Sequence, residues 1–300
     1  HILALAELAV LLAQQDNPEE GLEYAAQAVN FDKASVKAKI SLAHCLFKIG
    51  MQDSAFSVID EGVRHFPQSD LLKYGFAKAL ISGDTLRAEQ YGAAYLDLYP
   101  NGWWRSDVLT VFPNVDTTGS RQRETLESAV EWLRPGQKYT YRGKWGPFVL
   151  GRLDVEIGQL TVLDGQECYP ISYHIRSNPF LLVIKVDDFY RAYVTSNMSR
   201  TLRYDMRVRE TWWRYDRRCI MDNERGKLLQ RVIGDDGRLW IFEQELPSNL
   251  LDGTSLLFFT RRLVRDRRSG RAITLIDYNF AWTDIQFTGK KETLKYAGAK

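Results

Sequence analysis

Residues 245–265, ELPSNLLDGTSLLFFTRRLVR, decide the fold of the C-terminal half. Their apolar residues are too many for one face of a surface helix, and 256–259 is apolar on every side. Ser248 or Asn249 is expected to cap a helix over 248–265, because both side chains accept hydrogen bonds from free backbone N–H groups. The sequence therefore predicts one largely buried central helix in a half that is otherwise rich in strands.

Around this helix, the hydrophobic period is two. Over 201–209, apolar or aromatic residues alternate with charged ones, as in a strand with one buried face. Similar patterns predict strands at 138–146, 148–157, 159–164, 168–176, 189–196, 211–221, 227–233, 238–244 and 271–283. GDDG at 234–237 is typical of a hairpin turn, whereas 179–187 fits a strand or a helix. An antiparallel sheet with one apolar face must curl or be covered, and the central helix is the expected cover.

The order Asp252-x-x-Ser255, then apolar and aromatic residues, then Arg261 resembles a known signature. It is similar to the D-x-x-S…R motif of the exported bacterial family catalogued as domain of unknown function 3108. The resemblance covers roughly 139–290. Further matches are Gly146 and Gly151, the run 187–210 and the strand at 271–283.

This resemblance implies an exported protein with a curled antiparallel sheet, similar in outline to lipoprotein-carrier half-barrels. It also implies an apolar cavity, but no activity, since none is established for the family. The segment 209–221 departs from the family pattern, because it is longer and much richer in arginine.

The first 100 residues contain an internal repeat. Helix-ending segments close at residues 33, 67 and 100, a period of 34 and then 33, and the turns DNPEE, GMQDS and SGDT fall midway. The pattern resembles the tetratricopeptide repeat, and small residues such as Ala25, Ala28, Ala43, Ala55 and Ala77 fit its close helix contacts. The resemblance implies stacked helical hairpins, an α-solenoid, whose groove binds a partner protein. The alternative is a spacer that only packs on the β domain.

Between the two halves, 101–119 is predicted to be a connecting loop, followed by a short helix that starts at Ser120 and ends before residue 136. Trp103 and Trp104 are costly to expose in a loop. They either anchor a partner or, as we favour, fill the joint between the domains.

The composition limits the possible functions. The chain has 300 residues, 45% of them hydrophobic, which suffices for two domains. A formal charge of +2 gives no overall field that favours nucleic acid, and no apolar run is long enough to span a bilayer. Cys168 and Cys219 either form a disulfide or, as the stronger expectation, stay buried thiols like Cys45. The helical pattern at the start leads us to expect further repeats and any signal or lipid anchor upstream of His1.

The sequence contains no recognisable catalytic or metal-binding constellation. None of the four histidines has cysteine or carboxylate neighbours at metal-ligand spacing, and His44 and Cys45 diverge on a helix. Asp187 and Asp188 would face opposite sides of a strand, and the pair at 235–236 lies in a turn. No catalytic residue, metal or cofactor is therefore predicted.

Arginine clusters are the most unusual feature. They fit a solvated strand face, or contact with an acidic protein surface or lipid headgroups, better than nucleic acid. With the tryptophan pair, the candidate partner-binding residues are Trp103, Trp104, Arg214, Arg217, Arg218, Arg265, Arg267 and Arg268.

Aromatic residues at strand positions fit either a filled core around the helix, which we favour, or a cavity for an acyl chain or other apolar ligand. The candidate lining residues are Trp145, Tyr204, Trp240, Phe242 and Phe280.

Together these observations predict an α+β multidomain protein: helical repeats over 1–100, a connection over 101–136, and a curled antiparallel β domain over 137–300. We expect a non-enzymatic protein-binding or assembly component of the bacterial cell envelope, with a cytoplasmic location as the alternative. A periplasmic carrier of a lipid or other apolar ligand is the second hypothesis, and an enzyme is the third.

Overall fold

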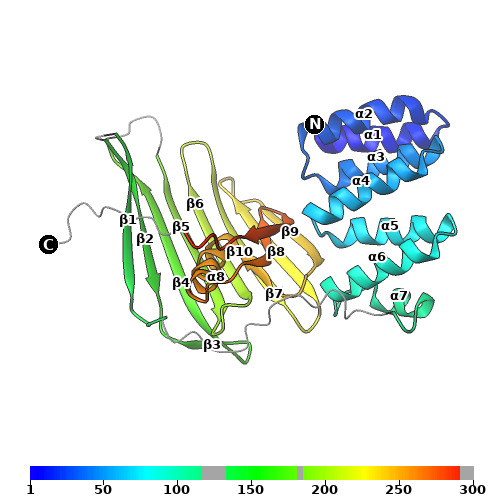
Figure 1. Cartoon of the computed structure of the whole chain (residues 1–300). Helices are drawn as coiled ribbons and strands as arrows, with labels where there is room; N and C mark the ends of the chain where they lie inside the picture. Colours follow the sequence, from blue (N-terminus) through cyan, green and yellow to red (C-terminus); the bar gives the residue numbers. More distant parts are fainter. Residues whose placement is uncertain (116–132, 147, 181–184, 291–300) are drawn as a thin grey trace.

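The computed structural model describes residues 1–115, 133–146, 148–180 and 185–290. The chain is α+β: helices form the N-terminal part, and strands with one further helix form the C-terminal part (Figure 1). This division confirms the predicted fold class at that level.

Consecutive N-terminal helices pair into hairpins that stack on one another (Figure 1). Helices α2, α4 and α6 begin at residues 18, 52 and 85, so the predicted spacing of 34 and then 33 recurs in the structure. The turns within the hairpins place Asp16, Gly50 and Gly83 at positive φ, 61°, 82° and 77°. The helices are α1 (Ile2–Gln14), α2 (Pro18–Phe31), α3 (Val36–Lys48), α4 (Gln52–His65), α5 (Ser69–Ile81), α6 (Thr85–Leu98) and α7 (Arg105–Val111).

Small residues let these helices approach closely. A Cβ on Gly21 would lie 2.6 Å from the Ala9 carbonyl oxygen, and one on Gly75 would lie 2.9 Å from the Tyr91 ring. Four of the five alanines predicted for close contacts, all but Ala77, are fully buried.

The predicted loop at 101–119 is wrong over its middle, because Arg105–Val111 forms α7. Val108 is buried against α6, where a Cβ on Gly92 would lie 2.9 Å from it. Seven residues are too few for a helical period to stand out in the sequence. The helix predicted from Ser120 falls almost wholly in 116–132, outside the described residues.

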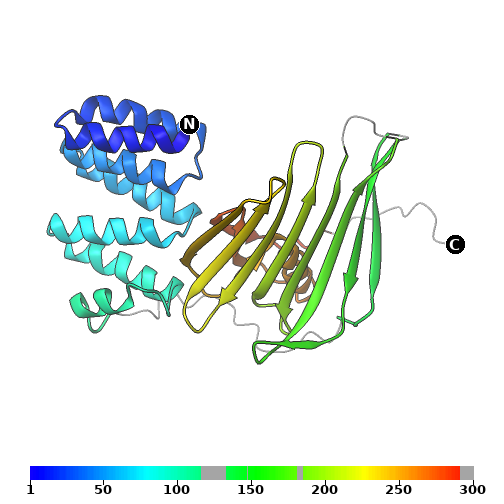
Figure 2. The same cartoon turned by 180° about the vertical axis from the view of Figure 1, so that it is seen from behind.

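The strands form a nine-stranded antiparallel sheet in the order β1-β2-β4-β5-β6-β7-β8-β9, with β3 paired to β4. Figure 2 shows the face that the C-terminal elements leave open. The predicted strands before residue 250 all occur, and 234–237 is the turn between β8 and β9. Part of 179–187, namely 181–184, lies outside the described residues. The strands are β1 (Lys138–Trp145), β2 (Phe148–Ile157), β3 (Thr161–Leu163), β4 (Gln166–Ser177), β5 (Asp187–Thr195), β6 (Thr201–Arg209), β7 (Arg214–Asp222), β8 (Lys227–Gly234) and β9 (Leu239–Glu245).

The helix within residues 245–265 is shorter than predicted. Helix α8 (Gly253–Arg265) starts five residues later than 248, since β10 (Leu250–Asp252) comes first and Asp252 caps the helix. Buried Leu250 and Leu251 pair with β11 (Gly270–Ile276), in parallel, as strand residues.

The long strand predicted at 271–283 is a hairpin of β11 and β12 (Asn279–Ile285). Asp277, at φ 52°, makes the turn. Helix α8 and this small sheet lie against one face of the large sheet, where Phe258 meets the ring of Tyr173 at 6.4 Å between centroids (Figure 1). The predicted covering helix is therefore present.

All three cysteines are buried free thiols, which confirms the favoured expectation. Cys168 on β4 and Cys219 on β7 are separated by two strands, about 14 Å across the sheet, which is twice the reach of a disulfide. Among the described residues, no helix combines the length and apolar composition needed to cross a bilayer.

Candidate functional site

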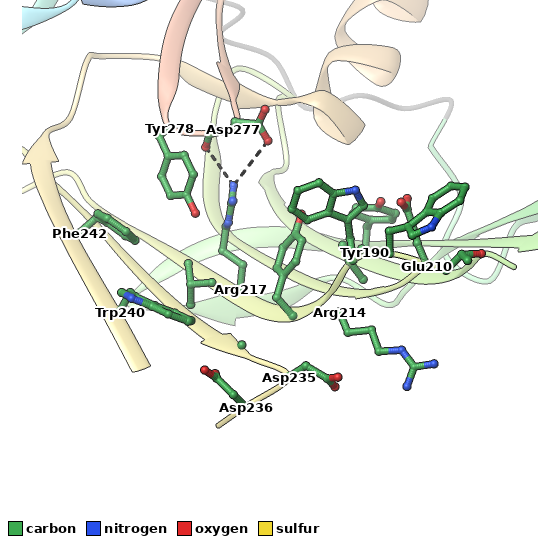
Figure 3. A pocket seen from close by; sticks show the side chains of 17 residues that line it. Tyr190, Glu210, Arg214, Arg217, Asp235, Asp236, Trp240, Phe242, Asp277 and Tyr278 are labelled. Carbon is green, nitrogen blue, oxygen red and sulfur yellow. Dashed lines mark hydrogen bonds and ion pairs between the residues drawn. The ribbon is translucent and has the colours of Figure 1, made fainter. Parts of the chain in front are cut away.

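The largest described pocket has a volume of about 1050 Å³. It lies on the face of the sheet that carries α8, between strands β5–β9 and the β11–β12 turn (Figure 3). Its lining residues are Tyr190, Val208, Glu210, Thr211, Trp212, Trp213, Arg214, Tyr215, Arg217, Val232, Gly234, Asp235, Asp236, Trp240, Phe242, Asp277 and Tyr278.

Aromatic side chains form the walls of this pocket. Trp240 and Phe242 project from β9, and the Phe242 ring lies 4.9 Å from that of Tyr278 on the β11–β12 turn (Figure 3). Trp212 and Trp213 precede β7 and are exposed. Leu239 and Ile241, which alternate with Trp240 along β9, are exposed on the opposite face of the sheet. β9 therefore carries exposed apolar side chains on both of its faces.

Arg217, one of the predicted partner-binding residues, lines the pocket but is largely buried. It is only 6% exposed, and its Nη1 donates to the Asp277 carbonyl at 3.1 Å and lies 4.0 Å from the carboxylate (Figure 3). The guanidinium also lies 4.3 Å from the ring centroid of Tyr278. Neighbouring Arg218 is exposed and pairs with Asp205 at 2.9 Å, because successive strand residues face opposite sides.

We expect Arg217→Met to lower the free energy of unfolding by about 2 kcal/mol, because it removes a buried charge-assisted hydrogen bond and a cation–π contact. Arg218→Met is the matched control and should change stability by less than about 0.5 kcal/mol, as for exposed ion pairs. Urea unfolding followed by circular dichroism measures both. Equal losses would contradict the structural role assigned to Arg217.

Two carboxyl groups meet at the wall of the pocket. The pKa of Glu210 is raised, mainly because the residue is partly buried. The negative charge of Asp188 and a hydrogen bond with its carboxyl group raise this pKa further. Asp188 is buried and accepts hydrogen bonds from the Arg209 N–H at 2.8 Å and the Tyr190 hydroxyl at 3.1 Å. Asp187 faces the other way, toward His174, so the neighbouring aspartates do diverge as expected. Within the described residues, no group of three or more potential ligands is placed to hold a metal ion.

The predicted tryptophan pair lies at the joint between the helices and the sheet. Trp104 packs on Phe76 and Tyr95, with ring centroids 4.9 and 6.0 Å away. Trp103 is half-exposed, and its backbone N–H donates to the buried carboxylate of Glu245 at 2.7 Å. The packing of Trp104 agrees with the favoured interpretation, that the pair fills the joint, whereas the side chain of Trp103 remains half-exposed.

Glu245, the last residue of β9, holds that joint. Its carboxylate also accepts from the Tyr95 hydroxyl and contacts the Lys73 ammonium. Burial alone would raise the pKa of Glu245, but hydrogen bonds from Lys73, Tyr95 and Ser69 outweigh it and lower the pKa.

The positions that match the family signature do not form one cluster. Asp252 and Ser255 are fully buried, and the Asp252 carboxylate accepts from the Thr201 hydroxyl at 2.7 Å and from the first N–H groups of α8. Arg261 is exposed and reaches the Tyr139 hydroxyl at 3.4 Å. The buried arginine is the next residue, Arg262, which donates to the Asn197 carbonyl at 2.7 Å.

The pocket gathers only some of the predicted site residues. Arg214, Arg217, Trp240 and Phe242 line it. Arg265, the last residue of α8, is exposed, as are Arg267 and Arg268 just beyond the helix. Tyr204 and Phe280 are buried in the core, as the filled-core alternative expects, and the Trp145 side chain lies outside the described part of the structure.

Sequence reasoning did not assign Tyr190, Glu210 or Asp277 to any site, because they come together only through strand order and the β11–β12 turn. Comparisons with protein-family models, with curated proteins and with solved structures found no match. The pocket offers aromatic faces, with carboxyl and guanidinium groups at their edges.

Proposed function

We propose that this chain is a non-enzymatic protein-binding component of the bacterial cell envelope. The observation that supports the proposal is the group of exposed apolar side chains on and beside β9. Trp212, Trp213, Trp240 and Phe242 lie on the pocket face, and Leu239 and Ile241 lie on the opposite face. Exposed apolar surface of this extent on a folded protein marks an interaction site. Charged and aromatic groups around it would orient the partner.

In this proposal, the N-terminal hairpins are a tetratricopeptide-like α-solenoid and the large sheet is a half-barrel around α8. The recurrent spacing of 34 and then 33 residues and the matching left-handed turns support the first assignment. The placement of α8 against one face of the sheet supports the second. The envelope location rests on the resemblance to the exported family alone.

Site-specific photocrosslinking tests the proposal. A photoreactive amino acid in place of Ile241, in the full-length protein in its own cells, is expected to give a discrete crosslinked product with another protein. Val162 on β3 is exposed and apolar but distant along the sheet, so the same replacement there serves as the control. No product at 241, or the same product at both positions, would contradict the proposal.

The pocket volume favours one second candidate, a carrier of a lipid or other apolar ligand. A volume of about 1050 Å³ with aromatic walls is large enough for such a ligand. Native mass spectrometry of the protein isolated gently from its own cells would then show a stoichiometric adduct of lipid mass. Phe242→Asp should remove the adduct, and a bare wild-type chain would count against this candidate.

A further inference from the structure

The two edges of the large sheet differ in how they are protected. At one edge, β1 carries Lys138, Arg142 and Lys144, and its register shifts at 143–144. Charged side chains and bulges of this kind prevent other strands from pairing with an edge. At the other edge, β9 reads Leu-Trp-Ile-Phe from residue 239, has no basic residue and pairs in uninterrupted register with β8. Of these two edges, the β9 edge is the one left open to a further strand.

The backbone of β9 has hydrogen-bonding groups directed away from β8. The Gly234 N–H donates to the Arg238 carbonyl at 3.0 Å, and the Leu246 N–H donates to the Gly226 carbonyl at 2.8 Å. In an antiparallel pair, alternate residues direct both backbone groups to the partner. The backbone groups of even-numbered β9 residues therefore form the hydrogen bonds with β8. The backbone N–H and C=O groups of Leu239, Ile241 and Glu243 point away from β8. These three residues are exposed, and β9 has no second neighbouring strand among the described residues.

The pocket lies beside this edge, on the face from which Trp240 and Phe242 project (Figure 3). Alternate side chains of a strand added to β9 would lie on the same face, next to these two rings.

The pocket lining beside β9 carries more acidic than basic groups. The pocket lining carries four carboxyl groups, Glu210, Asp235, Asp236 and Asp277, and two guanidinium groups, of which that of Arg217 is held by Asp277. Asp235 has no ion pair within the described part of the chain. Asp236 lies next to Trp240, since both come within 3.0 Å of a Cβ built on Gly234, and it pairs with Arg238 at 3.2 Å. Arg214 extends away from β9 (Figure 3). A basic side chain complements this end of the pocket.

We propose that an extended segment of a partner protein binds by adding a strand to β9, with apolar side chains against Trp240 and Phe242 and a basic side chain near Asp235. This inference rests on the proposed protein-binding function and specifies how the partner binds. Main-chain hydrogen bonds supply affinity in such complexes, and the side chains that enter the pocket supply specificity.

The test uses twelve-residue random peptides displayed on phage and selected against the whole chain. Selected peptides are expected to combine β-branched or aromatic residues with at least one lysine or arginine. Ile241→Pro removes one outward N–H without removing a bond to β8, and should weaken binding of a synthetic selected peptide about tenfold or more. Ile241→Val keeps that N–H and an apolar side chain, and should bind like the wild type. Asp235→Asn should weaken only peptides that carry the basic residue.

A second measurement does not depend on the folding of the proline variant. Two methylated peptides are compared, one methylated at the backbone nitrogens of odd-numbered residues and the other at those of even-numbered residues. Binding should be abolished in the peptide whose methylated nitrogens would face β9, and should be unchanged in the other. No selected peptide, equal binding to Ile241→Pro, or equal effects of the two methylation patterns would overturn strand addition. A crosslink at position 241 in cells would still support the protein-binding function in that case. The failure of strand addition can therefore be distinguished from the failure of the proposed function. Self-association of the chain that Ile241→Pro abolishes would instead identify a second copy as the occupant and overturn the proposal.

Discussion

Replacing Asp252 with alanine is expected to destabilise the β domain by about 3–5 kcal/mol, the larger share coming from buried hydroxyls that lose their acceptor. The Asp252 side chain is fully buried and caps α8 through Thr254 and Ser255. Losing a cap costs about 1 kcal/mol, up to 2. The hydroxyls of Thr201 and Ser255, both buried, would lose their carboxylate acceptor, at about 1–3 kcal/mol each. Urea unfolding followed by circular dichroism measures the sum.

The matched control is Asp266→Ala at the other end of α8. Its carboxylate is partly exposed and lies 3.8 Å from Arg262. A loss of less than about 1 kcal/mol is expected there. If the two variants lose similar stability, the buried network around Asp252 does not hold α8 in place. Triple replacement of Asp252, Thr201 and Ser255 by alanine should cost much less than the sum of the single changes, because the hydroxyls left without an acceptor are removed too.

Hydrophobic periodicity predicted most of the fold, because most of the helices and strands are long enough to show their period. The strands up to β9 and the hairpins of the N-terminal part follow directly from alternation and from spacing. Errors occur where an element is short or a turn lacks its usual residues. The two leucines at 250 and 251 fit the start of a helix as well as a strand. Asp277 makes a left-handed turn without glycine or proline, so the β11–β12 hairpin resembles one long strand.

The candidate site was less predictable, since its residues come from five strands and three turns. One signal was nevertheless present in the sequence. Arg217 lies two residues from both Tyr215 and Cys219, so alternation along β7 places its side chain on the same inner face as theirs. Treating all the arginines of this segment as one cluster overlooks the alternation. Asp277 and Tyr278 have no such signal, because only the tertiary fold brings the β11–β12 turn over the pocket.

Replacing Glu245 with glutamine is expected to lower the free energy of unfolding by about 3 kcal/mol at neutral pH, the second large effect that we predict. Glutamine keeps an acceptor for the Tyr95 hydroxyl and the Trp103 N–H but removes the charge that balances Lys73. Lys73 is partly exposed, so water replaces some of the lost interaction and keeps the effect below that of a fully buried pair. Asp70→Asn is the control, because this exposed carboxylate lies 4.0 Å from the same ammonium and should contribute little.

The pH dependence separates the charge of Glu245 from its shape. The folded protein lowers the pKa of Glu245 below its usual value of 4.5, so the unfolded chain takes up the proton first as the pH falls. The stabilisation is therefore fully present above that pH and is lost as the pH falls through the lower, folded-state pKa. The stability difference between wild type and Glu245→Gln should be constant from pH 6 to 8 and shrink in acid, at or below about pH 4. A difference that does not change with pH would mean that the joint depends on the packing of this side chain and not on its charge.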